Sequence, residues 1–554
     1  MKKEAILHIP MSEYAHAVSE KKVIFRLRAA KGDLKKCTLY YGDRACRQNP
    51  IIFSPEKMSI KYDDFLFEFW EAEFDALYRR ICYYFELDDG YIKTFYYADF
   101  FSDILQPERS EYYQLPYIHR NDIAAAPDWI KDAVIYNIFP DSFATGYRFI
   151  SRKPAEKKWN GEISRGKNGG TIQGIIKNTD YLRKLGINCI YINPMFAAGH
   201  YHKYDLLDYF NVDPCFGTNS DFSELVKILH NNDIRVIVDG VFNHCGWRFF
   251  AFNDVVKNGE NSKYKNWFYR LEYPVIRPDN GDEIPAYECF AYERLMPKLN
   301  TANPEVIKYF CDVCRHWLNE YDIDGWRLDV ADETDVGFWR MFKKAALEAK
   351  PDVFLIGEIW TNANYWLDGS MFHSAMNYDF RKHCREFFAK GTISAQEFNA
   401  RLTNMLTRYR RNLVYSQLNL LDSHDVSRFL SLCGGDKKRF KLTVLFQMCF
   451  VGVPGIFYGN EQGISGISED EYRQPMIWGG DEELFLFFRD VIKLRRENIP
   501  LSRGDFKTLY ANDKLFVFKR TYEEKTVTVA INAGFTMVNY HGQDIEPFGY
   551  LIQR

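Results

Sequence analysis

Short apolar runs alternate with longer amphipathic stretches from Ala133 onward. This alternation is typical of βα units, in which crossover helices join parallel strands. Eight apolar runs fit the strands of a closed barrel: 134–139, 187–193, 234–239, 324–329, 353–358, 375–378, 416–421 and 453–458. The pattern therefore predicts an α/β fold with a (β/α)8 TIM barrel across residues 121–500.

The segments that flank the barrel have a different pattern. Residues 1–120 contain short apolar runs separated by Gly, Asp, Asn and Pro, which predicts an N-terminal β-sandwich. Residues 501–554 predict a short C-terminal β-domain. The gap between the third and fourth barrel strands is unusually long, so we expect an inserted subdomain over the barrel mouth at about residues 245–300.

Composition narrows the possible partners. The chain has 72 basic and 75 acidic side chains and a net charge of -3, so neither nucleic acid nor a membrane is expected as a partner. Residues 1–14 have no apolar segment long enough for a signal peptide, which favours a cytoplasmic location. The 12 cysteines are scattered, and we expect reduced thiols instead of a disulfide framework or a zinc site.

Three acids follow predicted strands that are far apart in the sequence. Asp329 closes the fourth run, Glu358 closes the fifth, and Asp425 lies just beyond the seventh. The carboxyl ends of all strands in a parallel barrel meet at one face, so we expect the three carboxylates to be neighbours. Clustered carboxylates at such a face suit cleavage of a glycosidic bond.

The neighbours of these acids suggest separate roles. Arg327 lies on the same strand face as Asp329 and is expected to keep that carboxylate ionised as a nucleophile. Apolar residues follow Glu358, which favours a protonated general acid. Asp425, with His424 beside it, is expected to stabilise an oxocarbenium-like transition state. Singly, each residue fits an ordinary cap or ion pair, and only the joint pattern indicates catalysis.

Several segments resemble the signature regions of glycoside hydrolase family 13, the α-amylase family. These are DGVFNH at 239–244, GWRLD at 325–329, GEIW at 357–360 and LDSHD at 421–425. MPKLN at 296–300 is similar to the form in the neopullulanase, cyclomaltodextrinase and maltogenic amylase group, and HKYD at 202–205 also matches. The N-terminal portion resembles carbohydrate-binding module family 34.

The resemblance implies the same three catalytic roles for Asp329, Glu358 and Asp425. It also implies a set of substrate contacts. They are Tyr204, which would stack on the sugar, together with His202, His244, Arg327, Trp360, His424, Glu469 and Arg473. Two of these positions leave questions open: Trp360 fits barrel packing as well as a sugar contact, and Glu469 stands where the family commonly has Asp.

The family often binds calcium in the loop after the first strand, but the segment 143–150 has no acids here. Calcium prefers several oxygen ligands, so we expect no metal site and no cofactor, and calcium is not expected to be essential. The region near Asn243 still offers some oxygen ligands.

The expected substrates are cyclodextrins, pullulan and maltodextrins, cleaved at α-1,4 bonds by a retaining hydrolase. A homodimer is expected because the N-terminal domain of such proteins commonly covers the partner's active site. Two alternatives stay open from sequence alone: a transglycosylase of the same fold, and a non-catalytic carbohydrate-binding homologue. An α-1,6-specific hydrolase is disfavoured by the 296–300 segment.

Overall fold

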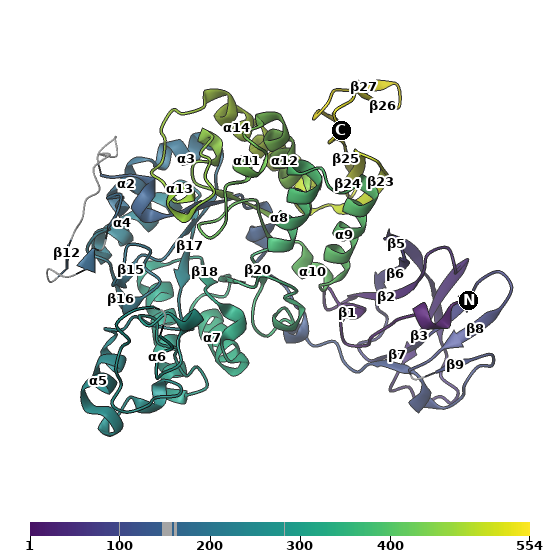
Figure 1. The fold of residues 1–554 in the computed structure, drawn as a ribbon. Coiled ribbons are helices and arrows are strands. Elements are labelled where there is room, and N and C mark those ends of the chain that lie inside the picture. Colours follow the sequence, from purple (N-terminus) through teal and green to yellow (C-terminus); the bar gives the residue numbers. More distant parts are fainter. Residues whose placement is uncertain (99, 147–157, 160–162, 165, 282) are drawn as a thin grey trace.

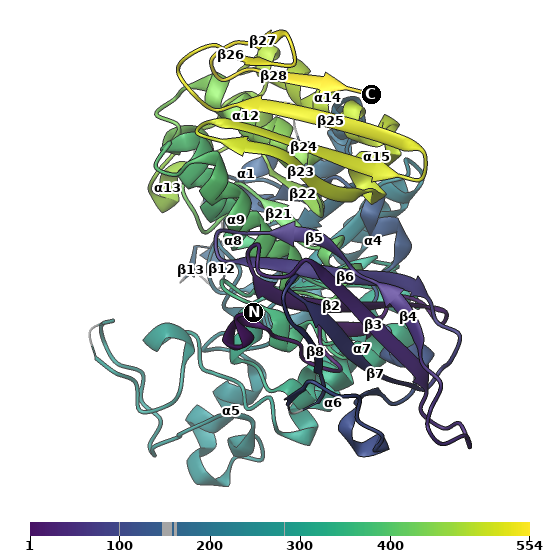
Figure 2. The same cartoon turned by 90° about the vertical axis from the view of Figure 1, so that its right-hand side faces the viewer.

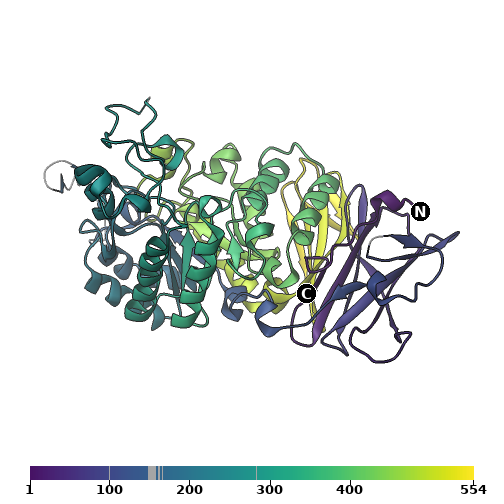
Figure 3. The same ribbon diagram turned by 90° about the horizontal axis from the view of Figure 1, so that it is seen from below.

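The computed structural model describes residues 1–98, 100–146, 158–159, 163–164, 166–281 and 283–554. A central α/β body forms the largest part of the molecule (Figure 1). The N-terminal β-domain and the C-terminal sheet both lie on one side of this body, next to each other (Figure 2 and Figure 3).

The central sheet has eight strands in the order β20-β19-β18-β17-β14-β11-β22-β21, all paired in parallel. They are β11 (Ile135–Ile138), β14 (Cys189–Ile192), β17 (Arg235–Gly240), β18 (Gly325–Leu328), β19 (Phe354–Gly357), β20 (Ser374–Ala375), β21 (Leu418–Leu420) and β22 (Val453–Phe457). A parallel bridge between Met376 and Leu418 joins the two outer strands. The predicted (β/α)8 barrel is therefore confirmed.

The sixth strand is shorter than the predicted run 375–378. It ends at Ala375, and α8 begins at Tyr378. The side chain of Asn377 accepts a hydrogen bond from the backbone N–H of Phe380, which caps the helix. An apolar pattern alone does not reveal this early helix start, so the predicted strand end was wrong.

Helices surround the barrel and cover the outer face of its strands (Figure 1). The α-helices of the described residues are α1 (Pro140–Phe143), α2 (Ile172–Lys177), α3 (Thr179–Leu185), α4 (Asn219–His230), α5 (Phe250–Asn258), α6 (Pro304–Tyr321), α7 (Val336–Ala349), α8 (Tyr378–Cys384), α9 (Ala395–Thr407), α10 (Arg411–Val414), α11 (Phe429–Leu432), α12 (Lys437–Cys449), α13 (Glu469–Tyr472), α14 (Glu482–Glu497) and α15 (Ile499–Arg503). Their starts have physical causes: Thr218 and Asp221 form a capping box at α4, and Asn303 caps α6 ahead of Pro304. No helix among the described residues is long and apolar enough to cross a bilayer.

The inserted segment lies between β17 and α6. It contains α5 and several short 3-10 turns, and it projects at the lower left of Figure 1. Its aromatic side chains pack on one another, with Phe252 contacting both Phe268 and Tyr287 edge to face. These rings belong to the same continuous core as the barrel, so the insertion is firmly attached beside the barrel mouth.

The N-terminal domain is a sandwich of two antiparallel sheets, as predicted. One has the order β1-β2-β6-β5 and the other β4-β3-β7-β8-β9, with β10 on β7. The strands are β1 (Ala15–Ala17), β2 (Lys22–Ala30), β3 (Lys36–Asp43), β4 (Ser54–Lys57), β5 (Ser59–Asp63), β6 (Phe67–Asp75), β7 (Ile81–Asp88), β8 (Lys93–Tyr96), β9 (Phe101–Ser102) and β10 (Tyr113–Leu115).

A buried ion pair network attaches this sandwich to the barrel. Glu71 on β6 lies between Arg26 of its own domain, at 2.7 Å, and Arg411 of α10. Arg26 also donates a hydrogen bond to the carbonyl oxygen of Thr407 at 2.7 Å. All three charged side chains are buried from water. Each charge therefore depends on its partners in the network, and removal of one leaves another buried without a partner.

The C-terminal domain is a sheet of order β23-β24-β25-β28 with a small β26-β27 hairpin. Its strands are β23 (Asp505–Asn512), β24 (Leu515–Tyr522), β25 (Lys525–Asn532), β26 (Val538–Tyr540), β27 (Gln543–Ile545) and β28 (Tyr550–Gln553). Arg520 of β24 donates hydrogen bonds to the carbonyl oxygens of Cys449 and Leu501, both at 2.8 Å. It thereby satisfies backbone groups at the end of α12 and in α15.

Candidate active site

The strand register brings the predicted acids together. Leu328 pairs with Gly357, and Gly240 pairs with Leu328, so the ends of β17, β18 and β19 lie side by side. Asp329 and Glu358 are the residues that follow these last two strands. The barrel geometry therefore places two carboxylates from separate βα units at one face.

A cavity of about 540 Å³ opens at this face. It is lined by His202, Tyr204, His244, Phe290, Met296, Asp329, Val330, Asp332, Glu333, Glu358, Trp360, Asp425, Glu469 and Arg473. Nine of the eleven predicted site residues are in this lining. The other two, Arg327 and His424, are fully buried and contact the lining acids from behind.

Arg327 lies behind the acids that line the cavity. Its Nη1 donates to Asp239 Oδ1 at 3.0 Å and to Asp329 Oδ1 at 2.7 Å, and its Nη2 pairs with Glu358 Oε1 at 2.7 Å. One guanidinium thus serves three buried carboxylates. The positive charge cannot neutralise all of them at once.

This imbalance determines the protonation of the two central acids. Burial raises the pKa of Asp329, Arg327 opposes that rise, and the charges of Glu358 and Asp239 add to it. Burial likewise raises the pKa of Glu358, again against the influence of Arg327. Because the two groups interact closely, they are best treated as one pair that retains a proton at pH values where ordinary carboxyls have lost it. Arg327 lowers the pKa of Asp329, in the direction expected from the sequence, while burial and the neighbouring carboxylates raise it.

Asp425 has the opposite tendency. Burial would raise the pKa of Asp425, but the charges of His424, Arg327 and Arg473 lower it further than burial raises it. His424 Nε2 lies 2.9 Å from Asp425 Oδ2, and Asn193 contacts His424 Nδ1 at 2.9 Å. The site therefore contains an ionised carboxylate, Asp425, beside a pair of carboxyls, Asp329 and Glu358, that retains a proton. Groups with such different pKa values can act as acid and base in one reaction.

Tyr204 closes the inner wall. Its ring is stacked on that of His424, with an interplanar angle of 9° and centroids 5.4 Å apart. Its hydroxyl lies 3.3 Å from Asp239 Oδ2 and also contacts His424. The ring is thus held by contacts of both its hydroxyl and its face, and Tyr204 lines the cavity.

Trp360 lies at the open side of the cavity. Its ring is stacked on Tyr378 at 3.9 Å with an interplanar angle of 6°, and 46% of its surface is exposed. This exposure places Trp360 at the mouth and outside the barrel core. A flat aromatic face in that position can pack against the apolar face of a sugar.

His244 is held as a neutral imidazole. Burial lowers the pKa of His244 to about 3, and the nearby charge of Lys298 adds to this. The ring is stacked on Phe290 of the insertion, with centroids 4.9 Å apart. Its Nε2 is buried and makes no hydrogen bond of normal geometry, although the backbone of Tyr204 lies close enough to influence the ring.

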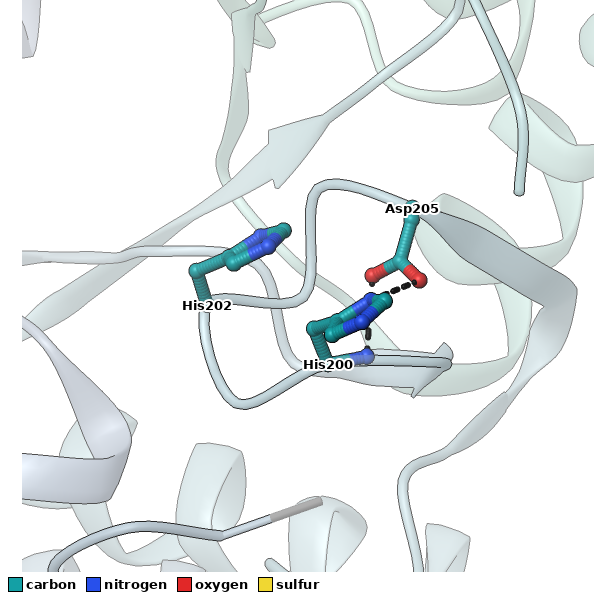
Figure 4. A group of neighbouring side chains, drawn as sticks. All are labelled: His200, His202 and Asp205. Atoms are coloured by element: carbon teal, nitrogen blue, oxygen red, sulfur yellow. Dashed lines mark hydrogen bonds and ion pairs between the residues drawn. The ribbon is translucent and has the colours of Figure 1, made fainter. Parts of the chain in front are cut away.

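The loop 199–205 contributes His202 and Tyr204 to the wall. His200, His202 and Asp205 lie close together in it, with potential metal-binding atoms within 4.8 Å of one another (Figure 4). However, His200 Nδ1 is bonded to Asp205 Oδ2 at 2.7 Å, and His202 Nδ1 accepts the backbone N–H of Tyr204 at 3.1 Å. These contacts brace the loop, and a group with two imidazoles does not suit calcium.

Some functional residues were not singled out from the sequence. Asp239 ends a barrel strand just as Asp329 does, so the same signal was present in the DGVFNH segment. Phe290 lies in the insertion, and Glu333 lies in a short turn after β18. Neither segment has a repeating apolar pattern that would indicate its place in the fold. Tyr378 was assigned to a strand, which hid its position beneath Trp360.

Comparison with known proteins agrees with this architecture. Residues 137–487 match the α-amylase catalytic domain, residues 1–119 match the N-terminal Ig-like domain of α-amylases, and residues 504–537 match an α-amylase C-terminal domain. The chain belongs to the α-amylase family.

Relatives of this α-amylase family enzyme cover nearly its whole length. It is 42% identical to a cyclomaltodextrinase of Geobacillus thermopakistaniensis, an alignment that covers 96% of this chain and 91% of the relative. It is 39% identical to neopullulanase 2 of Thermoactinomyces vulgaris, with 96% and 92% coverage. A solved cyclomaltodextrinase structure superimposes with a TM-score of 0.91 at 37% identity, covering 97% of this chain and 92% of that one. The chain is thus a glycoside hydrolase, and the recognised resemblance is confirmed.

Proposed function

We propose that this enzyme hydrolyses internal α-1,4-glucosidic bonds with retention, using Asp329 as nucleophile, Glu358 as general acid and base, and Asp425 as transition-state stabiliser. The observation that supports this most strongly is the shared contact of Asp329 and Glu358 with one Arg327 guanidinium, at 2.7 Å each. The separation of the two carboxylates is thereby limited to the width of one arginine head group plus two contacts. The shared partner places the two carboxylates on the same side of the site, and membership of the α-amylase family supports the retaining reaction.

The proposed chemistry has two steps. Asp329 attacks the anomeric carbon while Glu358 donates its proton to the departing glycosidic oxygen, which gives a covalent glycosyl ester. Water then attacks the same carbon and gives a proton to the Glu358 carboxylate, while the bond to Asp329 breaks and frees its carboxylate. Asp425 and the neutral His244 would bind sugar hydroxyls, and Tyr204 would stack on the ring. Arg473 with Glu469, His202 and Trp360 would hold neighbouring sugars.

We propose cyclodextrins, pullulan and maltooligosaccharides as substrates in preference to granular starch, since the relatives named above are a cyclomaltodextrinase and a neopullulanase. A cavity of about 540 Å³ with an aromatic platform at its rim is compatible with a few sugar units. Product analysis on β-cyclodextrin, pullulan, starch and maltotriose, with the anomer of the first product observed by NMR, tests this. Inverted product or faster cleavage of starch than of β-cyclodextrin would contradict it, and longer products from maltotriose would indicate transglycosylation.

A homodimer, a cytoplasmic setting and independence from cofactors are part of the proposal. Exposed apolar side chains at loops of the N-terminal domain, including Tyr91, Ile92, Ile104 and Leu105, offer a surface for a second copy. All twelve cysteines are free thiols, which suits a reducing compartment. Light scattering that found a monomer at every working concentration would rule out the dimer.

A further inference from the structure

A residue outside the cavity lining connects the loop 199–205 to the acid side of the site. The hydroxyl of Tyr201 donates a hydrogen bond to Glu469 Oε1 at 2.7 Å and accepts one from Arg473 Nη1 at 3.2 Å. We propose that Tyr201 is a positioning residue that holds the Arg473 and Glu469 pair in the orientation in which Arg473 reaches Asp425. This inference rests on the proposed hydrolytic function.

Arg473 is the group through which Tyr201 would act. Its Nε donates to the carbonyl oxygen of His424 at 2.7 Å, and its Nη2 donates to Asp425 Oδ1 at 3.3 Å. Its Nη1 is shared between Glu469 and Tyr201. Because the guanidinium is planar, fixing Nη1 on one side also fixes where Nη2 points on the other.

Glu469 does not fix that orientation alone. Its side chain is 53% exposed, although that of Arg473 is buried, and a carboxylate so open to solvent contributes little through an ion pair alone. The Tyr201 hydroxyl gives the carboxylate a second, directional partner. It also completes a closed set of three contacts among Tyr201, Glu469 and Arg473, which is harder to rearrange than a single pair.

Tyr201, which carries this hydroxyl, lies in a loop that several contacts hold in place. The His200 and Asp205 contact closes the loop (Figure 4). Lys203 pairs with Asp213 at 3.1 Å in a fully buried ion pair. The Tyr201 ring lies edge-on to Phe139 and beneath the ammonium of Lys167, which is 5.2 Å from the ring centroid. A rigid mounting of this kind is what a positioning role requires.

Removal of the hydroxyl should therefore act on turnover. Without it, Glu469 is free to turn to solvent, Arg473 follows, and the contact with Asp425 weakens. We expect Tyr201→Phe to reduce kcat by about tenfold, the size of a lost hydrogen bond to a charged group, with a smaller change in KM. The melting temperature should stay close to that of the wild type, because the ring and its packing remain.

The test is a double-mutant cycle on β-cyclodextrin and maltotriose with Tyr201→Phe, Glu469→Gln and the double variant. If Tyr201 acts through the pair, its substitution has little further effect once Glu469 is changed. Tyr112→Phe is the matched control, since it removes a tyrosine hydroxyl hydrogen bond of 2.6 Å to Gln106 in the N-terminal domain. It should leave kcat unchanged.

The outcomes separate the two proposals. An active wild type whose Tyr201→Phe variant keeps at least half of its kcat overturns the positioning role only. The same holds if the losses from Tyr201→Phe and Glu469→Gln simply multiply, or if activity falls only in step with the melting temperature. A wild type that hydrolyses none of the α-glucans overturns the proposed function and this inference together.

Discussion

Arg327 and Asp329, two positions apart at the end of β18, are joined by a 2.7 Å hydrogen bond from Nη1 to Oδ1. The same buried guanidinium pairs with Glu358 of the next strand. A period of two along a strand makes the first contact possible, and the parallel register of β18 and β19 makes the second. The positions of the two acids at this site thus follow from where β18 and β19 end, and Arg327 is the partner that both acids share.

Replacement of the nucleophile should abolish turnover without unfolding the protein. Asp329→Asn keeps the shape of the side chain but cannot form the glycosyl ester, so kcat should fall by at least a few orders of magnitude. Initial rates on β-cyclodextrin, with circular dichroism as the control for folding, measure this. A folded Asp329→Asn protein with near-normal activity would falsify the assignment.

Glu358→Gln should affect poor leaving groups far more than good ones. An activated aryl glycoside departs without protonation, so its first step should be largely spared, whereas a natural oligosaccharide needs the acid. The ratio of the two kcat/KM values, relative to wild type, is the measurement. Equal losses on both substrates would show that Glu358 is not the acid.

The pH profile should report the proton retained by the Asp329 and Glu358 pair. Burial raises the pKa of both groups, and nearby carboxylates add to the rise, Glu358 at Asp329 and Asp425 at Glu358. The alkaline limb of kcat/KM should therefore lie well above the ordinary carboxyl range near about 4. Activity is present while the pair holds its last proton and is lost as the pH rises through the raised value. Glu358→Gln should remove this limb for an activated substrate, and an unchanged limb in that variant would assign it to another group.

Much of this site could be predicted because its chemistry lies at strand ends. Asp329, Glu358 and Asp425 each follow an apolar run, and the barrel rule alone makes them neighbours. The family resemblance supplied Tyr204 and Arg473, which no local pattern marks as substrate contacts. The same strand-end argument applied to Asp239 would have found the third carboxylate on Arg327.

What could not be predicted depends on contacts between distant segments. Phe290 reaches His244 only because the insertion folds back over β17, and nothing in its own sequence indicates that. The protonation of Asp329 depends on how many carboxylates share one arginine, which is a property of the assembled site. Tyr201 contacts Glu469 across 268 positions of sequence.

The attachment of the N-terminal domain should depend on Glu71. Burial would raise the pKa of Glu71, but Arg411 and Arg26 lower it to about 2. Its folded pKa lies below its unfolded value, so the stabilisation is present above about pH 4 and is lost as the pH falls towards 2. The shift corresponds to about 3 kcal/mol at neutral pH.

Glu71→Gln should therefore lower the free energy of unfolding by about 3 kcal/mol and remove part of the acid sensitivity, as followed by thermal melting from pH 7 to 3. Glu86→Gln is the control, because its partner Lys93 is 62% exposed and the pair should contribute less than about 1 kcal/mol. Equal melting of the two variants at neutral pH would show that the buried network does not stabilise the interface.

The enzyme should work without calcium. The family resemblance points to the segment 143–150 as the usual place of the ion. This segment has no carboxylate in its sequence, and its residues 147–150 lie outside the described residues. Asp141, the nearest preceding acid, is buried, and its carboxylate accepts backbone N–H groups of Lys167, Asn168 and Gly169 at 2.9 to 3.2 Å. Oxygens that face several N–H donors are poorly placed to face a cation as well.

Extensive dialysis against a chelator, followed by activity and melting measurements, decides the calcium question. Neither quantity should change by more than the error of measurement, and addition of calcium to the treated protein should have no effect. A magnesium addition controls for ionic strength and for general binding of divalent ions. A loss of activity or of melting temperature that calcium restores and magnesium does not would mean that a site remains, with the oxygen ligands near Asn243 as the first place to test by substitution.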